Sequence, residues 1–154
     1  MTQFRTPKVI VIDDDPAVRS VLVAAFNRAG CETRWAVDGR AGVKLFNAEP
    51  AHLVVTDIVM PNQEGIETIL QLKRCEPAPR VIAISGGGRL GGRDFLLWAS
   101  HLGADATLAK PFRTSELIEV ARTLLESRST GAAPAPLPQG DVSGRTRFQP
   151  EVFA

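Results

Sequence analysis

The stretch VIVIDDDP, residues 9–16, decides the fold class of this 154-residue chain. Uninterrupted β-branched residues are typical of a strand that is buried on both faces, as in a parallel sheet covered by helices. Pro16 suits the first turn of a following helix, and Gly30 suits its end. The stretch therefore predicts a strand, an acidic turn and a helix, which is the first unit of an α/β fold.

The same alternation of strand and helix continues along residues 8–126. Short β-branched runs predict strands at residues 8–12, 32–36, 52–56, 80–84 and 106–108. Apolar residues at helical spacing predict helices around residues 18–26, 43–46, 66–72, 95–102 and 117–125. Strict alternation implies a doubly wound parallel sheet with right-handed crossovers and helices on both faces.

Composition excludes several classes of protein. Hydrophobic residues make up 44% of the chain, and 18 basic against 17 acidic residues give a net charge of +1. This balance provides no general attraction to nucleic acid or to an anionic membrane. The two cysteines, Cys31 and Cys75, are too few for a disulfide framework, so a reduced, cytoplasmic setting is expected. No stretch approaches the roughly 20 apolar residues that span a bilayer.

Polar residues follow four of the predicted strands, where sites of open parallel sheets lie. They are Asp13, Asp14, Asp15, Asp57, Ser85 and Lys110. Helix capping uses one aspartate, and two carboxylates about 5 Å apart repel by roughly 3 kcal/mol at an effective dielectric constant near 20. The group therefore needs a counter-charge, and Mg²⁺ prefers such oxygen ligands.

Aspartate, Mg²⁺, a hydroxyl and a lysine together suit phosphoryl transfer. A carboxylate can attack phosphorus and form an acyl phosphate, while the metal offsets charge on the transferring group. Lysine can pair with one phosphoryl oxygen, and a serine hydroxyl can donate to another. Because this reaction needs little beyond positioning and electrostatics, the small set is sufficient.

The chain resembles the receiver domain of bacterial two-component response regulators over about residues 6–126. The motifs that carry the resemblance are VIDDDP at 11–16, VTDIVMP at 55–61, Gly65, Ile84 with Ser85, and KPF at 110–112. The resemblance implies a (βα)5 flavodoxin-like fold with strand order 2-1-3-4-5. It also implies that Pro111 follows a cis peptide, which aims the preceding lysine inward.

The resemblance assigns roles to the residues at the strand ends. Asp57 would accept the phosphoryl group, Lys110 would pair with it, and Ser85 would follow it as a switch residue. Asp14 would bind Mg²⁺ directly, and Asp13 would help, often through water. Asp57 and the carbonyl of Val59 would complete the metal ligands, and Asp15 stays open as a cap or an outer group.

Two features depart from the family pattern. At position 107 the family usually has Tyr or Phe, whose ring moves with the hydroxyl at the end of the fourth strand. Here the residue is Thr107. A glycine-rich loop, residues 86–92, follows Ser85, and we hypothesise that this loop is the two-state element instead. The loop also satisfies a dinucleotide fingerprint, but no acidic residue ends the next predicted strand, as that site requires.

Residues 1–126 are expected to form the receiver domain, and residues 127–154 a tail rich in Pro, Gly and Ala, without an output domain. Such a tail has little to bury, so it is either solvated or docked through Phe148, Val152 and Phe153.

The resemblance implies a stand-alone response regulator rather than a turnover enzyme, one that catalyses only its own phosphorylation and dephosphorylation. Its phosphoryl donor in the phosphorelay would be a phosphohistidine of a sensor histidine kinase or histidine phosphotransfer protein. A downstream target, or the partner in a phosphorylation-dependent dimer, would contact the face formed by the fourth helix, fifth strand and fifth helix, near Trp98. Neither nucleic acid nor a membrane is an expected partner.

An enzyme is the alternative interpretation. A Mg²⁺-dependent phosphatase similar to the haloacid-dehalogenase superfamily would use Asp13 as nucleophile, in an Asp-x-Asp motif that Asp15 completes. Ser85 and Lys110 stand where that superfamily has its second and third motifs. The chain lacks an acid pair after Lys110 and a cap domain, and this interpretation leaves Asp57 unexplained. The two interpretations differ in the aspartate that becomes phosphorylated.

Overall fold

The computed structural model describes residues 5–58, 64–86, 97 and 99–129. The strands are β1 (Lys8–Ile12), β2 (Glu32–Ala36), β3 (Leu53–Asp57), β4 (Arg80–Gly86) and β5 (Ala106–Lys110). The helices with defined bounds are α1 (Pro16–Arg28), α2 (Gly39–Ala48), α3 (Glu64–Lys73) and α5 (Thr114–Ser129). In this described part no helix is long and apolar enough to cross a membrane.

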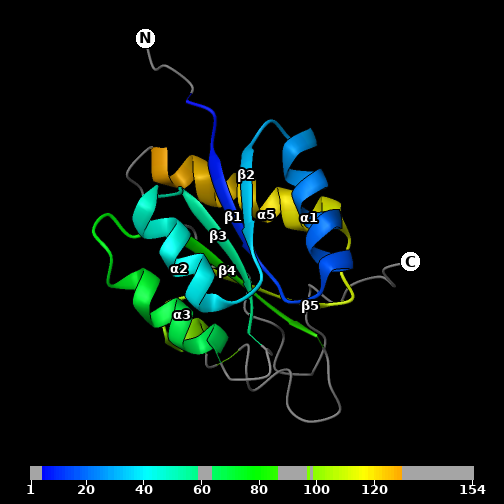
Figure 1. The fold of residues 1–154 in the computed structure, drawn as a ribbon. Helices are drawn as coiled ribbons and strands as arrows, with labels where there is room; N and C mark the ends of the chain where they lie inside the picture. The colour runs from blue at the N-terminus through cyan, green and yellow to red at the C-terminus, as the bar shows by residue number, and fades with distance from the viewer. Residues whose placement is uncertain (1–4, 59–63, 87–96, 98, 130–154) are drawn as a thin grey trace.

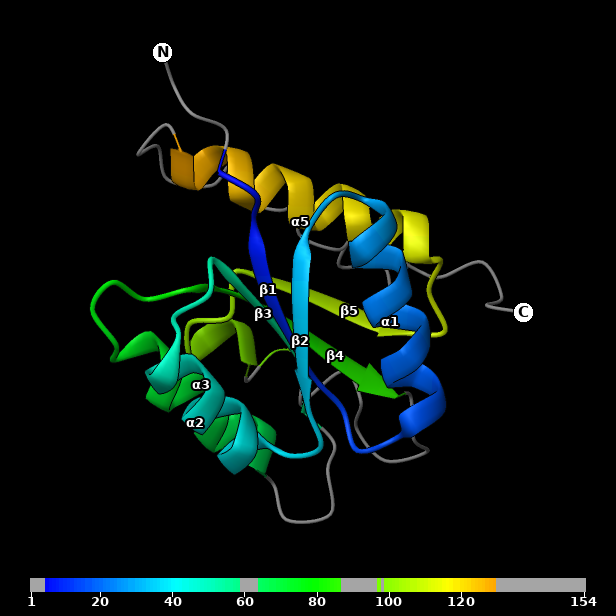
Figure 2. The ribbon, with the colours of Figure 1, turned by 45° about the horizontal axis from the view of Figure 1, so that its top comes forward.

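The strands form one parallel sheet in the order β2-β1-β3-β4-β5, which confirms the predicted fold. Helices α1 and α5 cover one face of the sheet, and α2 and α3 cover the other (Figure 1). The view in Figure 2 separates these two layers around the twisted sheet. The order brings β1 and β3 together, so residues distant in sequence meet at the carboxyl edge.

Each face of the sheet has its own hydrophobic core. Alternate residues of β1 divide between them, because successive side chains of a strand point to opposite faces. Val9 and Val11 pack with α1 and α5, whereas Ile10 and Ile12 pack with α2 and α3. All of β1 after Lys8 is buried, which explains its uninterrupted apolar sequence.

The predicted boundaries of the first helix are confirmed. Asp15 caps α1 by accepting a hydrogen bond from the Ala17 amide at 2.9 Å, and Pro16 occupies the first turn. Gly30, after the helix, has a φ of +89°, a conformation that glycine adopts without strain. The open role of Asp15 is therefore that of a helix cap.

Three strands end later than the sequence predicts. We expected ends at Thr56, Ile84 and Leu108, but the strands continue to Asp57, Gly86 and Lys110. Parallel pairing continues through these residues, with Asp57 opposite Ile84 and Gly86 opposite Lys110. The residues of the expected site therefore belong to the strand ends and are held by the sheet.

At the amino ends of the strands, opposite the expected site, Asp105 in the turn before β5 links neighbouring elements. Its carboxylate accepts hydrogen bonds from Lys73 Nζ at 2.9 Å and the Val81 amide at 2.8 Å. Arg80 Nη1 lies 3.2 Å from the other oxygen, so one acidic side chain ties α3, β4 and β5 together.

Several expectations lie outside the described residues. These are the Val59 carbonyl, the loop after Gly86, most of the expected fourth helix including Trp98, and the tail from residue 130. In the expected fourth helix, the described residues 97 and 99–101 are helical, with Leu97 exposed and Ala99 buried. Helix α5 continues to Ser129, past the expected boundary at residue 126.

Candidate functional site

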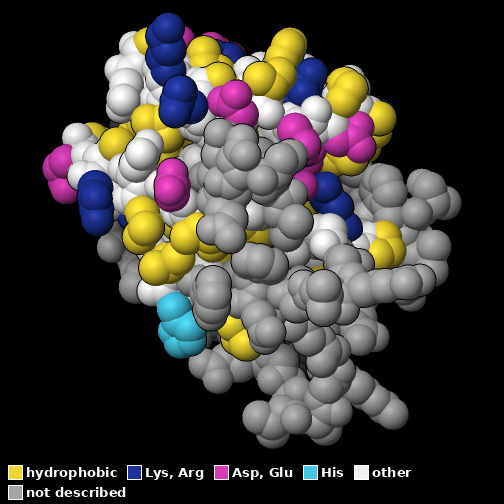
Figure 3. Space-filling view, turned by 60° about the horizontal axis from the view of Figure 1, so that its bottom comes forward, with side chains coloured by type: hydrophobic (Ala, Val, Ile, Leu, Met, Phe, Trp, Pro, Cys, Tyr) yellow, Lys and Arg dark blue, Asp and Glu magenta, His cyan; other side chains and the backbone are white. Residues whose placement is uncertain are grey.

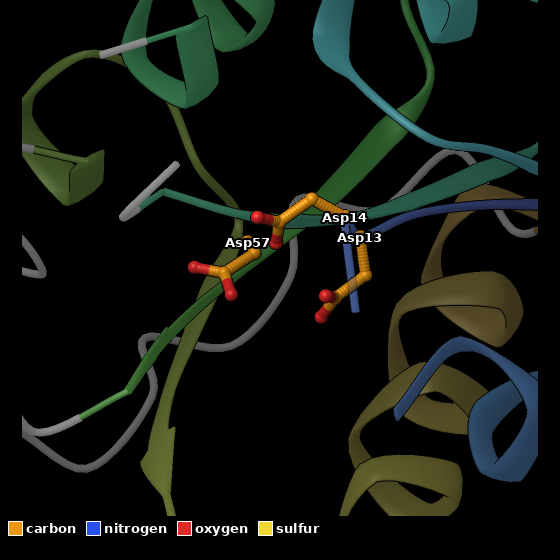
Figure 4. Close-up of side chains that lie close together, drawn as sticks. All are labelled: Asp13, Asp14 and Asp57. Carbon is orange, nitrogen blue, oxygen red and sulfur yellow. The ribbon is translucent and has the colours of Figure 1, made fainter. Parts of the chain in front are cut away.

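Three carboxylates gather at the carboxyl edge of the sheet. Asp13 and Asp14 follow β1, and Asp57 ends the neighbouring strand β3. One oxygen from each carboxylate lies within 4.8 Å of the others. Figure 4 shows the three side chains close together. Asp13 and Asp57 are buried, with 1% and 6% of their surface exposed, while Asp14 is exposed. Three carboxylates this close together have the geometry and the charge that could hold a cation.

Lys110 supplies one cation to this cluster. Its Nζ lies 3.1 Å from Asp57 Oδ2 and 3.4 Å from Asp13 Oδ2. The lysine reaches β3 across the end of β4, where its strand partner is Gly86. A Cβ on Gly86 would lie 3.7 Å from Lys110 Cδ, so the stem of the lysine passes close over this glycine. The expected cis peptide between Lys110 and Pro111 is present.

The ionisation of the cluster reflects both burial and charge. Burial is the main cause that raises the pKa of Asp13, and the charge of Asp57 adds to it. The Asp15 amide and Lys110 lower the same pKa but do not cancel the effect of burial. Burial lowers the pKa of Lys110, but the charges of Asp57 and Asp13 raise it by more. The net pKa of Lys110 is raised, so its ammonium stays charged at neutral pH.

Ser85, the sixth residue of β4, has a hydroxyl that makes no hydrogen bond to the described residues. The side chain is 1% exposed, and its Oγ has no hydrogen-bond partner among the described residues. Ser85 follows Ile84, the strand partner of Asp57, so it stands at the same edge of the sheet. An unpaired buried hydroxyl is costly. A phosphoryl oxygen on Asp57 is an acceptor that would satisfy it.

The donor set fits Mg²⁺. Hard divalent cations take oxygen ligands, and carboxylates from Asp13, Asp14 and Asp57 provide three of them. The exposure of Asp14 leaves one side of the cluster open to water, which Mg²⁺ retains in most protein sites.

Gly65 places α3 against the strand that carries Asp57. A Cβ on this glycine would lie 2.4 Å from the Ile58 Cα and 2.6 Å from the Asp57 carbonyl oxygen. Only a residue without a side chain permits this approach. The sequence motif includes Gly65, and the structure supplies the physical reason for it.

Thr107 is not part of the acidic cluster. It lies within β5 opposite Ala83, three residues before Lys110 and deeper in the sheet. Ser85 is two pairs nearer the carboxyl edge, opposite Ala109. The structure thus brings ligand oxygens of Asp13, Asp14 and Asp57 within 4.8 Å of one another and pairs Lys110 with Asp13 and Asp57. Ser85 lies at the same edge of the sheet.

One residue of the site was missed in the sequence. Arg19, in α1, donates a hydrogen bond from Nη1 to the Asp13 carbonyl oxygen at 3.0 Å. An arginine near the start of a helix normally faces solvent, and no motif singles it out. Its spacing of six residues from Asp13 offers no signal, because the contact depends on how the turn before α1 bends.

A doubly wound sheet with an acidic cluster and a lysine at its carboxyl edge defines a phosphoacceptor class of α/β signalling domain. The chain belongs to the response regulator receiver domain family, whose profile matches residues 9–122. The receiver assignment expected from the sequence is confirmed. Receiver domains act in two-component signalling.

Relatives support the same assignment. Sporulation initiation phosphotransferase F of Bacillus subtilis is 30% identical, over 79% of this chain and 96% of that protein. The DNA-binding transcriptional regulator NtrC of Azospirillum brasilense is 31% identical over 94% of this chain. The chain spans only 31% of that regulator's length. The receiver domain of NtrX from Brucella abortus matches with a TM-score of 0.71 at 29% identity, covering 77% of this chain and 98% of that domain.

Proposed function

We propose that this protein is a phosphorylatable signalling module in which Asp57 accepts a phosphoryl group from a phosphohistidine, with Mg²⁺ at the acidic cluster. The observation that carries the proposal is the meeting of Asp57 with Asp13, Asp14 and Lys110 at one sheet edge. Family membership supports it.

The proposed transfer uses the Asp57 carboxylate as nucleophile. One carboxylate oxygen attacks phosphorus opposite the P–N bond of the phosphohistidine, and a P–O bond forms while the P–N bond breaks. The electron pair of the broken bond stays on the imidazole nitrogen, which takes a proton from solvent. Lys110, 3.1 Å from Asp57 Oδ2, pairs with the negative charge of the transferred group.

The metal ligands in this proposal are the carboxylates of Asp13, Asp14 and Asp57, with the carbonyl of Val59 as a further ligand. When bound, Mg²⁺ offsets charge on the phosphoryl oxygens and on the crowded carboxylates. The buried Ser85 hydroxyl, which has no partner in the described part, donates to the phosphoryl group and so registers phosphorylation. Thr107 stays in the proposal as the residue at the family's usual switch position.

The proposed donors are a sensor histidine kinase or a histidine phosphotransfer protein. The name of one relative, a sporulation initiation phosphotransferase, supports a role in a phosphorelay. Output through protein contact is part of the proposal; the other relative is a DNA-binding transcriptional regulator, of whose length this chain spans only 31%. Cys31 and Cys75 are both unpaired, as a reducing cytoplasm would keep them.

The test is to locate the modified aspartate. The protein is incubated with Mg²⁺ and a small-molecule phosphodonor, trapped with borohydride and digested for peptide mass spectrometry. We expect label on Asp57 that requires Mg²⁺ and is absent from Asp57→Asn. Asp38→Asn, which alters an aspartate that caps α2 and is not one of the three cluster carboxylates, is the matched control and should retain the label.

Two other results would contradict the proposal. Label on Asp13 with continuous release of phosphate would favour the phosphatase interpretation, which the family assignment argues against. A protein that binds Mg²⁺ but takes no label from any donor would be a receiver that signals without phosphorylation.

A further inference from the structure

Arg19 links the acidic cluster to Trp35 on β2, the outermost strand on one side of the sheet. Its Nη1 donates to the Asp13 carbonyl oxygen at 3.0 Å, and its guanidinium lies 4.3 Å from the centre of the Trp35 ring on β2. We propose that Arg19, held in place by Trp35, is a positioning residue that orients the Asp13–Asp14 peptide for metal binding. The inference rests on the Mg²⁺ site proposed above.

Asp13 is fixed at every polar group. Its amide donates to the Ala36 carbonyl at 3.2 Å, and Asp13 Oδ1 accepts from the Asp15 amide at 2.9 Å. Asp13 Oδ2 faces Lys110, and the carbonyl oxygen accepts from Arg19. Asp13 is almost fully buried, so the loss of Arg19 would leave a buried carbonyl without this charged donor.

The orientation of the Asp14 backbone depends on the Asp13 carbonyl. The peptide unit between Asp13 and Asp14 is planar, so fixing the Asp13 oxygen also fixes the direction of the Asp14 amide and Cα. Asp14 is exposed, yet one of its carboxylate oxygens lies within 4.8 Å of ligand atoms from Asp13 and Asp57. Arg19 therefore favours the peptide orientation in which the exposed aspartate completes the cluster.

Trp35 explains why the arginine stays in this position. Trp35 is 51% exposed on the edge strand β2, so its ring is accessible to a side chain from α1. With Arg19 and the outer residues of α1 it lines an open hollow of about 310 Å³. A guanidinium over an indole face is favourable even near solvent, and the contact restricts a side chain that otherwise has many rotamers.

Charge and positioning make opposite predictions for the removal of Arg19. As a cation beside three carboxylates, Arg19 repels Mg²⁺, so charge alone predicts tighter binding when it is lost. Positioning predicts weaker binding, because Asp14 loses its preferred orientation. The sign of the change therefore separates the two effects.

The experiment measures Mg²⁺ affinity by calorimetry for the wild type and four variants. We expect Arg19→Ala to bind about tenfold more weakly, the effect of losing one hydrogen bond from a charged donor. Arg19→Lys, which can still donate to the carbonyl, should recover part of the affinity. Trp35→Leu should lose about threefold. Arg28→Ala removes the same charge from the other end of α1 and should match the wild type.

A second measurement follows the fluorescence of Trp35 in a Trp98→Phe background. Mg²⁺ should change the emission in this background, and Arg19→Ala should abolish the change. Thermal unfolding without Mg²⁺ shows whether each variant is folded. In the calorimetry, Trp35→Leu tests the same link while keeping Arg19.

The outcomes separate the inference from the proposed function. Equal or tighter Mg²⁺ binding by Arg19→Ala, in a folded protein, would overturn the positioning role of Arg19 and leave the metal site intact. A wild type that binds no Mg²⁺ would instead overturn the proposed metal site itself.

Discussion

At the scale of single residues, Lys110 decides the electrostatics of the cluster. Its ammonium lies within 3.4 Å of both Asp13 and Asp57, the two buried carboxylates. Without a cation these carboxylates would repel one another in a partly dry environment. In the proposed transfer, the same ammonium would pair with a phosphoryl group on Asp57.

We predict that Lys110→Ala separates metal binding from phosphorylation. Loss of the cation removes a competitor for the carboxylates, so the affinity for Mg²⁺ should not fall. The rate of Asp57 labelling should fall by roughly 10²–10³-fold, the usual effect of removing one group that stabilises transition-state charge. Calorimetry and borohydride labelling on the same preparation measure both quantities. Labelling at the wild-type rate would show that Lys110 has no part in transfer.

Glu49, outside the site, provides a prediction on pH. Its hydrogen bond from Lys8 is the main cause that lowers its pKa, and the charges of Lys8 and Arg34 act in the same direction. Because the pKa is lowered by folding, this ion pair stabilises the protein above the ordinary pKa of a glutamate. The stabilisation is lost as pH falls through the folded-state value.

Glu49→Gln should therefore melt below the wild type at pH 7, and the two melting temperatures should converge once the pH is below the lowered folded-state pKa of Glu49. Thermal unfolding followed by circular dichroism between these pH values measures the difference. Because the Glu49 side chain is 46% exposed, salt can screen the ion pair, and high salt should reduce the gap at pH 7. A gap that persists unchanged at low pH would contradict this explanation.

At the scale of the elements, two glycines set how closely helices approach the sheet. A Cβ on Gly65 of α3 would meet backbone atoms of Ile58 and Asp57, which cannot move aside. A Cβ on Gly42 of α2 would meet Ile12 Cδ1 at 2.2 Å and Ile12 Cγ1 at 2.7 Å, which are atoms of a buried side chain and not of the backbone. The first contact constrains the position of α3 and of the strand end, whereas the second can be relieved in part by movement of one side chain.

We predict that Gly65→Ala destabilises the protein by about 3 kcal/mol, the upper range for overpacking a well-packed contact. Gly42→Ala is the matched control, with the same atom added to a helix on the same face. Its cost should be smaller, because Ile12 can move and alanine favours the helix. Urea unfolding measures both changes. Equal losses for the two variants would show that the backbone contact at Gly65 is not special.

At the scale of the whole molecule, the two ends of the strands differ. Their carboxyl ends carry the site, whereas at their amino ends Asp105 forms ion pairs with Lys73 and Arg80. On the face shown in Figure 3, acidic and basic side chains are interspersed among hydrophobic ones, so neither sign dominates its described part. The concentration of negative charge is local, at Asp13, Asp14 and Asp57. A cation bound there should stabilise the whole fold, because β1 and β3 lie at the centre of the sheet.

We predict that Mg²⁺ raises the melting temperature and that a chelator reverses the effect. Binding to the folded state alone contributes about 2.7 kcal/mol at a concentration 100 times the dissociation constant. Asp14→Asn should weaken the response, since it removes one carboxylate without altering a buried residue. Calorimetric melting with Mg²⁺ and with the chelator provides the comparison. An equal rise in Asp14→Asn would place the ion elsewhere.

Residue order alone was sufficient to predict the class of fold and most of the site. Continuous apolar strands alternating with amphipathic helices allow few arrangements other than a covered parallel sheet, because each element must bury its apolar surface. The rule that sites lie at the carboxyl ends of such strands then singles out Asp13, Asp14, Asp57, Ser85 and Lys110. These inferences succeed because they depend on local pattern and on chain direction.

Tertiary structure decided what depends on contacts between distant segments. The strands end at Asp57, Gly86 and Lys110, because pairing with a neighbour extends them beyond their β-branched residues. The contacts of Arg19 with the Asp13 carbonyl and Trp35 join segments with no shared pattern. Hydrogen bonds of this kind depend on the path of the backbone in space, which no local periodicity encodes.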